Sequence, residues 1–550
     1  MIDDVSTLGE LIDRAAQRWP QREALVHGVG RITYAELCRR AMALAAALLR
    51  LGVRRGDKVA VLFANVPEWA YAEYAVVKIG AVVVPISTRY SRDEIHHVLR
   101  HSDSTTILLM ERHHQSDFLA TLCGICPELP ACPPGELRSA AAPRLRNVVV
   151  SGEGRHPGTF DFGELLQAPA PGDEELVAAA QAEVRPDDVA HLPYTSGTTG
   201  LPKGVMTTHA QYLRFNQGFI RGIGGFSPED RLCVAAPFCH NFGNSQGILT
   251  PALCGSTSVL VESFAPEACL ALLERERCTF FAGSPTIFIK MLADPSLSSR
   301  DLSSLRSGLI AAAPAPVAVI EEIRSRLGIR TLVNGYGMTE NSVGTTMTRP
   351  GDPPEILATT VGKVLWPEYE LRVVDPATGQ ALPPGQAGEL CTRGPLIMKG
   401  SYKMPEATAA ALDAEGWFHT GDLATLDEQG YVRISGRLKD IFMPGGLNVS
   451  PEEVENVLYA QPAVKEAAVV GVPDPVLGEV GAAFVELKEG ETATEAELVA
   501  ACRERLASYK VPKYVIFSRD FPTTSSGKHK KYLLKEEAIR RLGLENRSAP

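Results

Sequence analysis

The strongest constraint on the fold is a repeated alternation of short apolar segments with amphipathic ones. Residues 56–110 contain three strand-like segments, GDKVAVLFAN, AVVVPIS and TTILLM, separated by the helical segments PEWAYAEYAVVKIG and SRDEIHHVLRHSD. The same rhythm returns over residues 230–290, where RLCVAAPF, STSVLVE and TFFAGSP read as strands and PEACLALLERER reads as a helix. Strands separated by helices at this spacing pair in parallel through right-handed crossovers. The sequence therefore predicts two similar α/β lobes.

The remainder of the chain departs from this rhythm in two places. Residues 127–147 are rich in Pro and Ala, which predicts a mobile surface loop. Residues 361–435 contain short strands and Gly/Pro turns, which predict a small β subdomain, and the α/β rhythm returns after it. We expect an α/β fold with a large N-terminal domain, residues 1–436, and a smaller α+β C-terminal domain, residues 440–550.

Composition narrows the class of protein. A chain of 550 residues exceeds the size of a single hydrophobic core, and a net charge of −10 disfavours nucleic acid as a partner. The sequence has no apolar run long enough for a transmembrane segment, and its acidic, amphipathic N-terminus is unlike a signal peptide. The eleven scattered cysteines fit a reducing compartment, so we expect a cytoplasmic protein. Nothing in the sequence indicates an oligomeric state.

Two cysteines, Cys123 and Cys126, have the spacing of a CxxC motif. A zinc site would need further ligands at short spacing, and a redox pair would follow a βαβ pattern. Neither is evident, so the end of a helix is the favoured interpretation.

The segment YTSGTTGLPKGV, residues 194–205, is rich in Gly, Ser and Thr and carries one lysine. Such a loop brings backbone N–H groups and hydroxyls close to anionic oxygens. It is not a Walker A loop, because Leu201 and Pro202 separate Gly200 from Lys203. A flexible connection would remain the alternative if this loop stood alone.

Five further motifs follow in order along the chain: PFCHNFG (237–243), NGYGMTE (334–340), GWFHTGDL (416–423), SGRLKDIFMPGGLNVSPEEVE (435–455) and PTTSSGKHKK (522–531). Together with the loop at 194–205, they resemble the signature motifs of the adenylate-forming superfamily, which includes acyl-CoA synthetases. The resemblance covers nearly the whole chain. It implies a two-step reaction, in which a carboxylate attacks ATP to give an acyl-AMP and pyrophosphate, and a thiol then displaces AMP. It also implies ATP, Mg²⁺ and CoA as the required small molecules.

By this resemblance, residues from several motifs bind ATP. They are Thr195, Ser196, Gly197, Thr198, Thr199 and Lys203 in the loop, Ala312 and Ala313 at the adenine side, Tyr336 and Gly337, Thr339 at the α-phosphate, and Asp422 and Arg437 at the ribose and phosphates. Glu340 is the expected magnesium ligand. Taken singly, Asp422 also fits a turn or helix-cap aspartate, Glu340 a helix cap and Tyr336 a core residue.

The C-terminal motifs imply a moving domain. Lys528, in SSGK, is the expected catalytic lysine of the first step. Lys439, in the segment 437–439, is the expected hinge for the rotation between steps. After that rotation, Gly445 and Gly446 are expected to let the CoA thiol pass close to the backbone. Three residues depart from the pattern: Ala312 and Ala313 stand where glycine is common, and His529 stands where an apolar residue is usual.

The acid pocket is expected around His240, Asn241 and Gly335, with His240 beside the carboxylate. A packed, purely structural histidine is the alternative for His240. PFCHNFG contains no acidic residue to pair with an ammonium group, so an amino acid substrate is disfavoured. The motifs from 334 onward resemble fatty-acyl-CoA synthetases, whereas His240-Asn241 resembles the pair in enzymes that activate salicylate-type aryl acids. We favour an aliphatic acid and keep an aryl acid as the alternative. CoA is the expected acceptor, and a separate carrier protein is the alternative acceptor.

Overall fold

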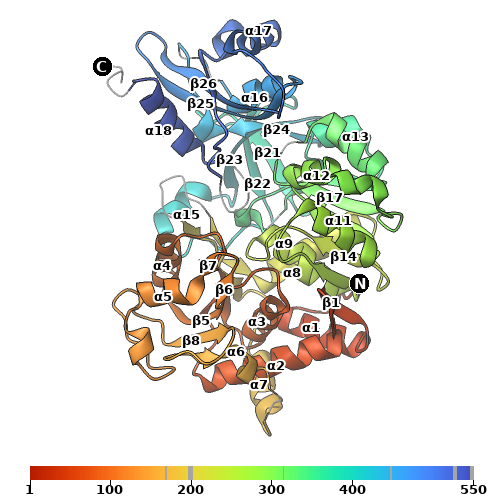
Figure 1. Cartoon of the computed structure of the whole chain (residues 1–550), viewed down its shortest axis with the longest axis vertical. Coiled ribbons are helices and arrows are strands. Elements are labelled where there is room, and N and C mark those ends of the chain that lie inside the picture. Colours follow the sequence, from red (N-terminus) through yellow and green to blue (C-terminus); the bar gives the residue numbers. More distant parts are fainter. Residues whose placement is uncertain are drawn as a thin grey trace. The chain divides into compact units, whose positions relative to one another are not determined.

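The computed structural model describes residues 1–167, 170–195, 202–313, 315–342, 344–445, 447, 449–523 and 529–544. The chain divides into two compact units. The first unit comprises Met1–Glu370 and Arg393–Gly416, and the second comprises Leu371–Thr392 and Trp417–Pro550. In Figure 1, residues Met1–Glu370 of the first unit run from red to green, and its segment Arg393–Gly416 is cyan. The sequence predicts a domain boundary at residues 436–440, where the C-terminal domain would rotate between the reaction steps. This boundary stays a prediction.

The first unit contains a nine-stranded sheet that is parallel at its centre. Its strands, in spatial order, are β2 (Gly30–Thr33), β1 (Glu23–His27), β15 (Thr257–Leu260), β14 (Arg231–Val234), β16 (Phe280–Gly283), β17 (Ser307–Ala311), β18 (Thr331–Tyr336), β19 (Thr346–Met347) and β20 (Lys363–Val364). The outer strands β2, β19 and β20 pair antiparallel. The sheet is therefore the predicted second lobe, extended at both edges.

A seven-stranded sheet forms the other lobe of this unit. Its order is β13 (Thr207–Thr208), β10 (Val189–His191), β4 (Val82–Pro85), β3 (Lys58–Leu62), β5 (Ser104–Met110), β8 (Asn147–Ser151) and β9 (Phe160–Asp161). All its pairs are parallel except β10 with β13. Two small hairpins accompany the sheets, β6 (Arg112–His113) with β7 (Ser116–Asp117) and β11 (Tyr194–Thr195) with β12 (Lys203–Gly204).

Helices cover both sheets. They are α1 (Leu8–Arg18), α2 (Tyr34–Arg50), α3 (Pro67–Lys78), α4 (Arg92–His101), α5 (Phe118–Ile125), α6 (Phe162–Leu165), α7 (Asp173–Ala182), α8 (His209–Gly222), α9 (Asn241–Asn244), α10 (Thr250–Cys254), α11 (Pro266–Arg275), α12 (Pro285–Leu292), α13 (Val317–Arg326), α14 (Pro354–Thr359) and α15 (Pro405–Ala411). Figure 1 shows α11, α12 and α13 in green beside β14 and β17. Their buried side chains, such as Leu270, Phe288 and Ile320, share one core with Phe281 and Ile310 of the nine-stranded sheet. Burial of such side chains contributes roughly 1.5–3 kcal/mol each and fixes the helices on the sheet.

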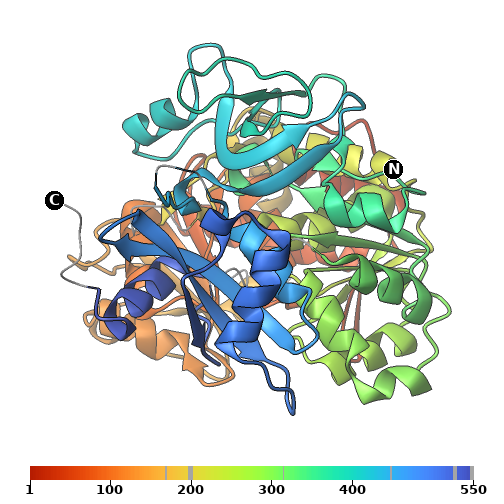
Figure 2. The ribbon, with the colours of Figure 1, turned by 90° about the horizontal axis from the view of Figure 1, so that it is seen from above.

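The second unit contains two further sheets. The strands β21 (Glu370–Val374), β22 (Gly388–Arg393), β23 (Phe418–Leu426) and β24 (Val432–Arg437) form one, and β25 (Val464–Asp474), β26 (Gly478–Leu487) and β27 (Tyr514–Phe517) form the other. The helices α16 (Pro451–Tyr459), α17 (Glu495–Arg505) and α18 (Lys531–Arg541) accompany the three-stranded sheet (Figure 2). Val469 and Val485 face Val454 and Leu498, from α16 and α17, while Phe484 on the opposite face packs with α18. Successive strand residues point to opposite faces, so this sheet has a core on each side.

The expected alternation of strands and helices is confirmed in both lobes. Helix α4 begins after Ser91, the first residue of the helical segment SRDEIHHVLRHSD, and the Ser91 hydroxyl accepts from the Glu94 backbone N–H in a capping box. Cys126 caps the C-terminus of α5, as the helix-end interpretation of the CxxC motif required. Among the helices of the described residues, none combines the length and the apolar character that a bilayer crossing requires.

The segment 127–147 differs from the prediction of a mobile surface loop. It has little regular structure, but its leucines Leu129, Leu137 and Leu145 are fully buried in the core of the seven-stranded sheet. Composition indicated the absence of regular structure correctly. Composition did not predict the burial of the three leucines, which fixes the segment to the core.

Candidate active site

Three predicted site segments follow strands in the parallel part of the nine-stranded sheet. The PFCHNFG motif follows β14, Ala312 and Ala313 follow β17, and Gly337 to Glu340 follow β18. Because β14, β16, β17 and β18 are parallel, their carboxyl ends meet at one edge of the sheet. Ligands of open α/β sheets bind outside this edge. The fold thus gathers at one edge segments that lie about a hundred residues apart.

The ends of β17 and β18 are in direct register. Ala311 pairs with Gly335, and the next residue, Tyr336, ends β18 and pairs with Thr346. Ala312 has a backbone φ of 79°, in the left-handed region that favours glycine. The sequence departure at this position therefore carries backbone strain.

The hairpin of β11 and β12 frames the predicted phosphate loop. Tyr194 pairs with Gly204, and Thr195 lies opposite Lys203. Ser196, Gly197, Thr198 and Thr199 lie outside the described residues. The hairpin places Thr195 and Lys203 side by side at the base of the loop.

Glu340 lies next to this hairpin. The Thr195 hydroxyl donates to Glu340 Oε1 at 3.4 Å, although the two residues are 145 positions apart in the chain. The backbone carbonyl of Glu340 accepts from the Met398 N–H at 2.8 Å, which fixes the turn. Thr339 and Glu340 begin a short 3-10 helix that ends at Asn341. A carboxylate and a hydroxyl this close offer two hard oxygen donors, which fits Mg²⁺.

His240 and Asn241 stand at the start of α9. His240 is the N-cap residue, and its Nε2 atom is buried without a hydrogen-bond partner among the described residues. Burial, with the nearby Arg89 charge, lowers the pKa of His240 to about 4, so the imidazole is neutral at neutral pH. Asn241 is buried, and its Oδ1 accepts a 2.6 Å hydrogen bond from the Tyr212 hydroxyl. Asn241 Nδ2 has no partner among the described residues.

Two residues outside the PFCHNFG motif, Asn65 and Glu73, hold the turn before α9 and the end of α9. The Asn65 side chain donates to the Ala236 carbonyl at 3.1 Å and accepts from the Phe238 N–H at 2.8 Å. A Cβ on Gly243 would lie 2.2 Å from the Pro237 carbonyl oxygen, so only glycine fits there. Asn244, at the end of α9, donates to the fully buried carboxylate of Glu73. No local pattern marks Asn65 or Glu73, because their partners are about 170 residues away.

In the second unit, Asp422 and Arg437 lie together. They are paired residues of β23 and β24, and Arg437 Nε lies 3.0 Å from Asp422 Oδ1. The Asp422 side chain is 4% exposed, whereas the Arg437 side chain is 38% exposed. Asp422 is a strand residue, which excludes the alternative that it caps a helix. Lys439 lies two residues beyond β24, and burial lowers its pKa.

Two other predicted residues, Gly446 and Lys528, lie outside the described residues. Gly445 has a φ of 59° and its N–H donates to the Leu477 carbonyl. His529 packs against Phe521, with ring centroids 5.1 Å apart, and its Nε2 lies 3.3 Å from Glu466 Oε1. These contacts explain a residue for which the sequence offered no account.

Comparison with protein families decides the identity of this architecture. Residues 12–402 match the AMP-binding enzyme family, and residues 453–528 match the AMP-binding enzyme C-terminal domain. The chain belongs to the AMP-binding enzyme family. The predicted resemblance is thereby confirmed.

Individual relatives agree with this family. The medium-chain acyl-CoA ligase ACSF2 of Danio rerio is 36% identical over 546 residues, which cover 98% of this chain and 89% of the relative. The 3-[(3aS,4S,7aS)-7a-methyl-1,5-dioxo-octahydro-1H-inden-4-yl]propanoyl:CoA ligase of Rhodococcus jostii is 38% identical, with 98% and 100% covered. Among solved structures, the anthranilate CoA ligase AuaEII in complex with anthranoyl-AMP aligns with a TM-score of 0.84 at 27% identity and covers 98% of both chains. These matches confirm the α/β fold class and the expected enzyme class, an AMP-forming acid–CoA ligase that uses ATP and CoA.

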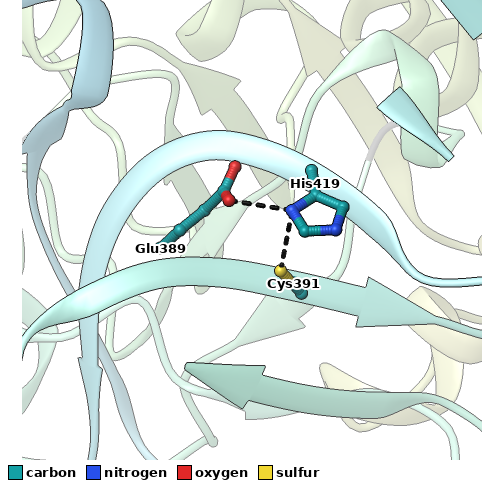
Figure 3. A group of neighbouring side chains, drawn as sticks. All are labelled: Glu389, Cys391 and His419. Atoms are coloured by element: carbon teal, nitrogen blue, oxygen red, sulfur yellow. Dashed lines mark hydrogen bonds and ion pairs between the residues drawn. The ribbon is translucent and has the colours of Figure 1, made fainter. Parts of the chain in front are cut away.

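One cluster of this AMP-binding enzyme was not found from the sequence. Glu389 and Cys391 on β22 converge with His419 on β23 (Figure 3). Glu389 Oε2 lies 2.8 Å from His419 Nδ1, and Cys391 Sγ lies 3.5 Å from the same nitrogen. The motif GWFHTGDL indicates a role for its aspartate and none for its histidine. The cluster forms only when β22 pairs with β23, and no local sequence pattern marks that pairing.

Proposed function

We propose that this AMP-binding enzyme joins an aliphatic carboxylic acid to CoA. In the first step, a carboxylate oxygen attacks the α-phosphorus of ATP, and pyrophosphate leaves. In the second step, the CoA thiolate attacks the acyl carbonyl of the acyl-AMP, and AMP leaves. The first step brings two anions together, so it needs positive charge and hydrogen-bond donors placed in advance.

The contact between Thr195 and Glu340 carries this proposal. It sets a carboxylate beside the base of the phosphate loop, where Lys203 also lies. Glu340 with Thr195 would hold Mg²⁺, which supplies charge neutralisation on the phosphates when bound. Lys203 and the loop residues 196–199 would bind the phosphate oxygens.

Further residues take named roles in this proposal. The buried Asp422, oriented by Arg437, would accept hydrogen bonds from the ribose hydroxyls. Tyr336, Gly337, Ala312 and Ala313 would border the adenine. Thr339 would bind the α-phosphate.

A further set of residues would act on the carboxylic acid and on the transfer of its acyl group to CoA. The neutral imidazole of His240 would leave the acid carboxylate uncompensated until Lys528 supplies its ammonium group, and Gly335 would border the acid pocket. Lys439 would be the hinge between the two steps, and Gly445 with Gly446 would border the path of the CoA thiol.

An aliphatic acid is the favoured substrate class for two reasons. The relatives named above include a medium-chain acyl-CoA ligase and a ligase for a propanoate side chain on a bicyclic ring. In addition, the segment 237–243 offers no carboxylate for an ammonium group, and leaving such a charge unpaired would be costly. An aryl acid is the second candidate, favoured by Asn241, whose Nδ2 donor faces no partner among the described residues.

The experiment is a substrate panel read by pyrophosphate release. Straight-chain acids of short, medium and long length are compared with benzoic, 2-aminobenzoic and 2-hydroxybenzoic acids. We expect the highest kcat/KM for an aliphatic acid. A preference of tenfold or more for an aryl acid would overturn the aliphatic assignment and leave the ligase assignment intact. Replacing CoA with a phosphopantetheinylated carrier protein tests the acceptor, and we expect CoA to be used.

A further inference from the structure

We propose that Glu389, Cys391 and His419 of the second unit form a binding site for a divalent metal ion of the zinc type. Figure 3 shows the three side chains pointing toward one another from two neighbouring strands. Their ligand atoms, a carboxylate oxygen, a thiol sulfur and an imidazole nitrogen, all lie within 4.8 Å of one another. This site is separate from the magnesium position proposed at Glu340.

The strand pairing explains why the three side chains converge. Cys391 and His419 are paired residues of β22 and β23, whereas Glu389, two positions earlier, pairs with Leu423. The register therefore shifts between these two pairs, and extra residues of β23 bulge out there. Gly421, with a φ of 70°, permits the bulge. The bulge turns the His419 ring toward the two side chains of β22.

Two distances between the ligand atoms suit a tetrahedral zinc site, and the third pair, Cys391 with Glu389, lies within 4.8 Å. With zinc about 2.3 Å from sulfur and about 2.0 Å from nitrogen, a tetrahedral angle separates the two ligand atoms by about 3.5 Å. Cys391 Sγ and His419 Nδ1 are 3.5 Å apart. The nitrogen and oxygen ligands of such a site lie about 3.3 Å apart, so Glu389 Oε2 and His419 Nδ1, now 2.8 Å apart, need to separate by only about half an ångström.

The chemistry of the ligand set indicates zinc rather than magnesium. Thiolate and imidazole ligands suit zinc and related borderline metals, whereas magnesium and calcium take oxygen ligands. On binding, the Cys391 thiol releases its proton to solvent, and the His419 proton resides on Nε2 so that Nδ1 can coordinate. Three protein ligands leave a fourth position for water.

The ligands are held in place by contacts outside the cluster. Glu389 Oε1 accepts from the Gly421 N–H at 3.1 Å, which fixes the carboxylate while Oε2 faces the cluster. The Thr420 hydroxyl donates to the Leu390 carbonyl at 2.7 Å and ties the bulge to β22. Such supporting contacts set the orientation of metal ligands. The Cys391 residue is fully buried, but the His419 side chain is 30% exposed and gives the ion a way in.

Metal binding would act on the nucleotide-binding turn. His419 precedes Asp422 by three residues, and Glu389 contacts Gly421, the neighbour of Asp422. An ion that separates Glu389 from His419 would shift this turn. We therefore expect Zn²⁺ to inhibit acyl-AMP formation, an expectation that rests on the proposed role of Asp422.

Cobalt is the probe for binding itself. Co²⁺ is titrated into the full-length, reduced, chelator-treated protein, and the absorption spectrum is recorded. We expect a thiolate-to-cobalt charge-transfer band in the near ultraviolet, saturation at one Co²⁺ per chain, and its displacement by Zn²⁺. This readout does not depend on catalysis, so it stands or falls separately from the proposed function.

Variants assign the band to this cluster. Cys391→Ser should abolish the charge-transfer band, and His419→Gln should weaken Co²⁺ binding about tenfold or more. Cys502→Ser is the matched control, because Cys502 is another fully buried cysteine of the same unit and should leave the spectrum unchanged. Circular dichroism checks that each variant is folded, and His419→Gln decides the matter if Cys391→Ser is not.

The outcomes are separable. Three results would overturn the site. They are a wild-type protein without the band, a band that persists in folded Cys391→Ser, and an unchanged Co²⁺ affinity in His419→Gln. The three side chains would then only stabilise the bulge through hydrogen bonds.

The effect of Zn²⁺ on catalysis is measured as the ratio of pyrophosphate release with Zn²⁺ to pyrophosphate release without Zn²⁺, for the wild type and for each variant. The inhibitory role is supported if this ratio lies at least several-fold below one in the wild type and stays near one in Cys391→Ser. Equal ratios in the two proteins would overturn that role.

Discussion

Ala312 occupies a backbone conformation that its side chain disfavours. An L-residue in the left-handed region costs about 1–2 kcal/mol, whereas glycine adopts it readily. Ala312 has a φ of 79°, and it directly follows β17 at the carboxyl edge of the nine-stranded sheet. Strain of this kind is concentrated at functional positions.

We predict that Ala312→Gly stabilises the protein. Relief of the strain outweighs the extra unfolded-state entropy of glycine, and the net gain is about 0.5–1 kcal/mol. Ala313→Gly is the matched control, since Ala313 is absent from the residues with positive φ and should lose stability instead. The midpoint of thermal unfolding measures both variants. Midpoints that move in the same direction would contradict the strain argument.

The depressed pKa of His240 predicts a pH dependence of stability. The folded protein binds a proton at His240 only near pH 4, whereas the unfolded chain binds it near 6.5. The unfolded state is therefore favoured progressively as the pH falls through this window, and no such penalty exists above it. A difference of about 2.5 pKa units corresponds to a loss of about 3 kcal/mol at most.

We expect His240→Gln to remove this loss. The difference in unfolding midpoint between wild type and variant should shift in favour of the variant between pH 7 and pH 5. Because each protein serves as its own reference at pH 7, the direct cost of the substitution cancels. A difference that is constant with pH would show that His240 does not titrate in this window.

At the scale of an element, α9 depends on helices far away in the sequence. The Tyr212 hydroxyl, on α8, holds Asn241 at 2.6 Å, and Glu73, on α3, accepts from Asn244. Directly after α9, residues Ser245–Leu249 form a π-helix, a feature found most often at functional sites. The element that carries the proposed acid-pocket residues is thus anchored at both ends.

We predict that Tyr212→Phe raises the KM for the acid several-fold and leaves the KM for ATP unchanged. Removing the hydroxyl leaves Asn241 Oδ1 buried without this donor, which costs about 1–3 kcal/mol and frees the side-chain amide to turn. Tyr74→Phe is the matched control, because Tyr74 is also fully buried and its hydroxyl donates to the Ile248 carbonyl in the π-helix at 3.3 Å. Steady-state kinetics with the preferred acid measure both. Equal changes in the two variants would point to a general loss of packing.

The elements that the sequence predicted are those with a local signal. Helix α4 has its serine cap and apolar stripe, and β5 is a continuous apolar run, so both could be located by periodicity. The glycine-rich segment 194–205 predicts a phosphate loop in the same way, and this assignment stays a prediction. The contacts of Asn65, Tyr212 and Glu389 could not be predicted, because each partner is brought close only by the folded chain. A further case is segment 127–147, where three buried leucines outweigh the composition of a loop.

At the scale of the whole molecule, the residues that we propose for adenylation are distributed over both units of the chain. Thr195 and Glu340 belong to the first unit, whereas Asp422, Arg437 and Lys528 belong to the second. Adenylation needs an ammonium group to offset the repulsion between the acid and ATP, and we assign this role to Lys528. Thioester formation starts from a neutral acyl carbonyl and does not need that charge.

We therefore predict that Lys528→Ala separates the two steps. Pyrophosphate release should fall by at least a hundredfold, an increase of about 2.7 kcal/mol in the barrier, whereas thioester formation from supplied acyl-AMP should stay within about threefold of wild type. Lys530→Ala is the matched control, because it removes a nearby lysine of the same motif and should leave both steps close to wild type. If Lys528→Ala slowed both steps equally, its ammonium group would serve binding in general. The assignment of one charge to one half-reaction would then fail, and with it the need for Lys439 to move this residue between steps.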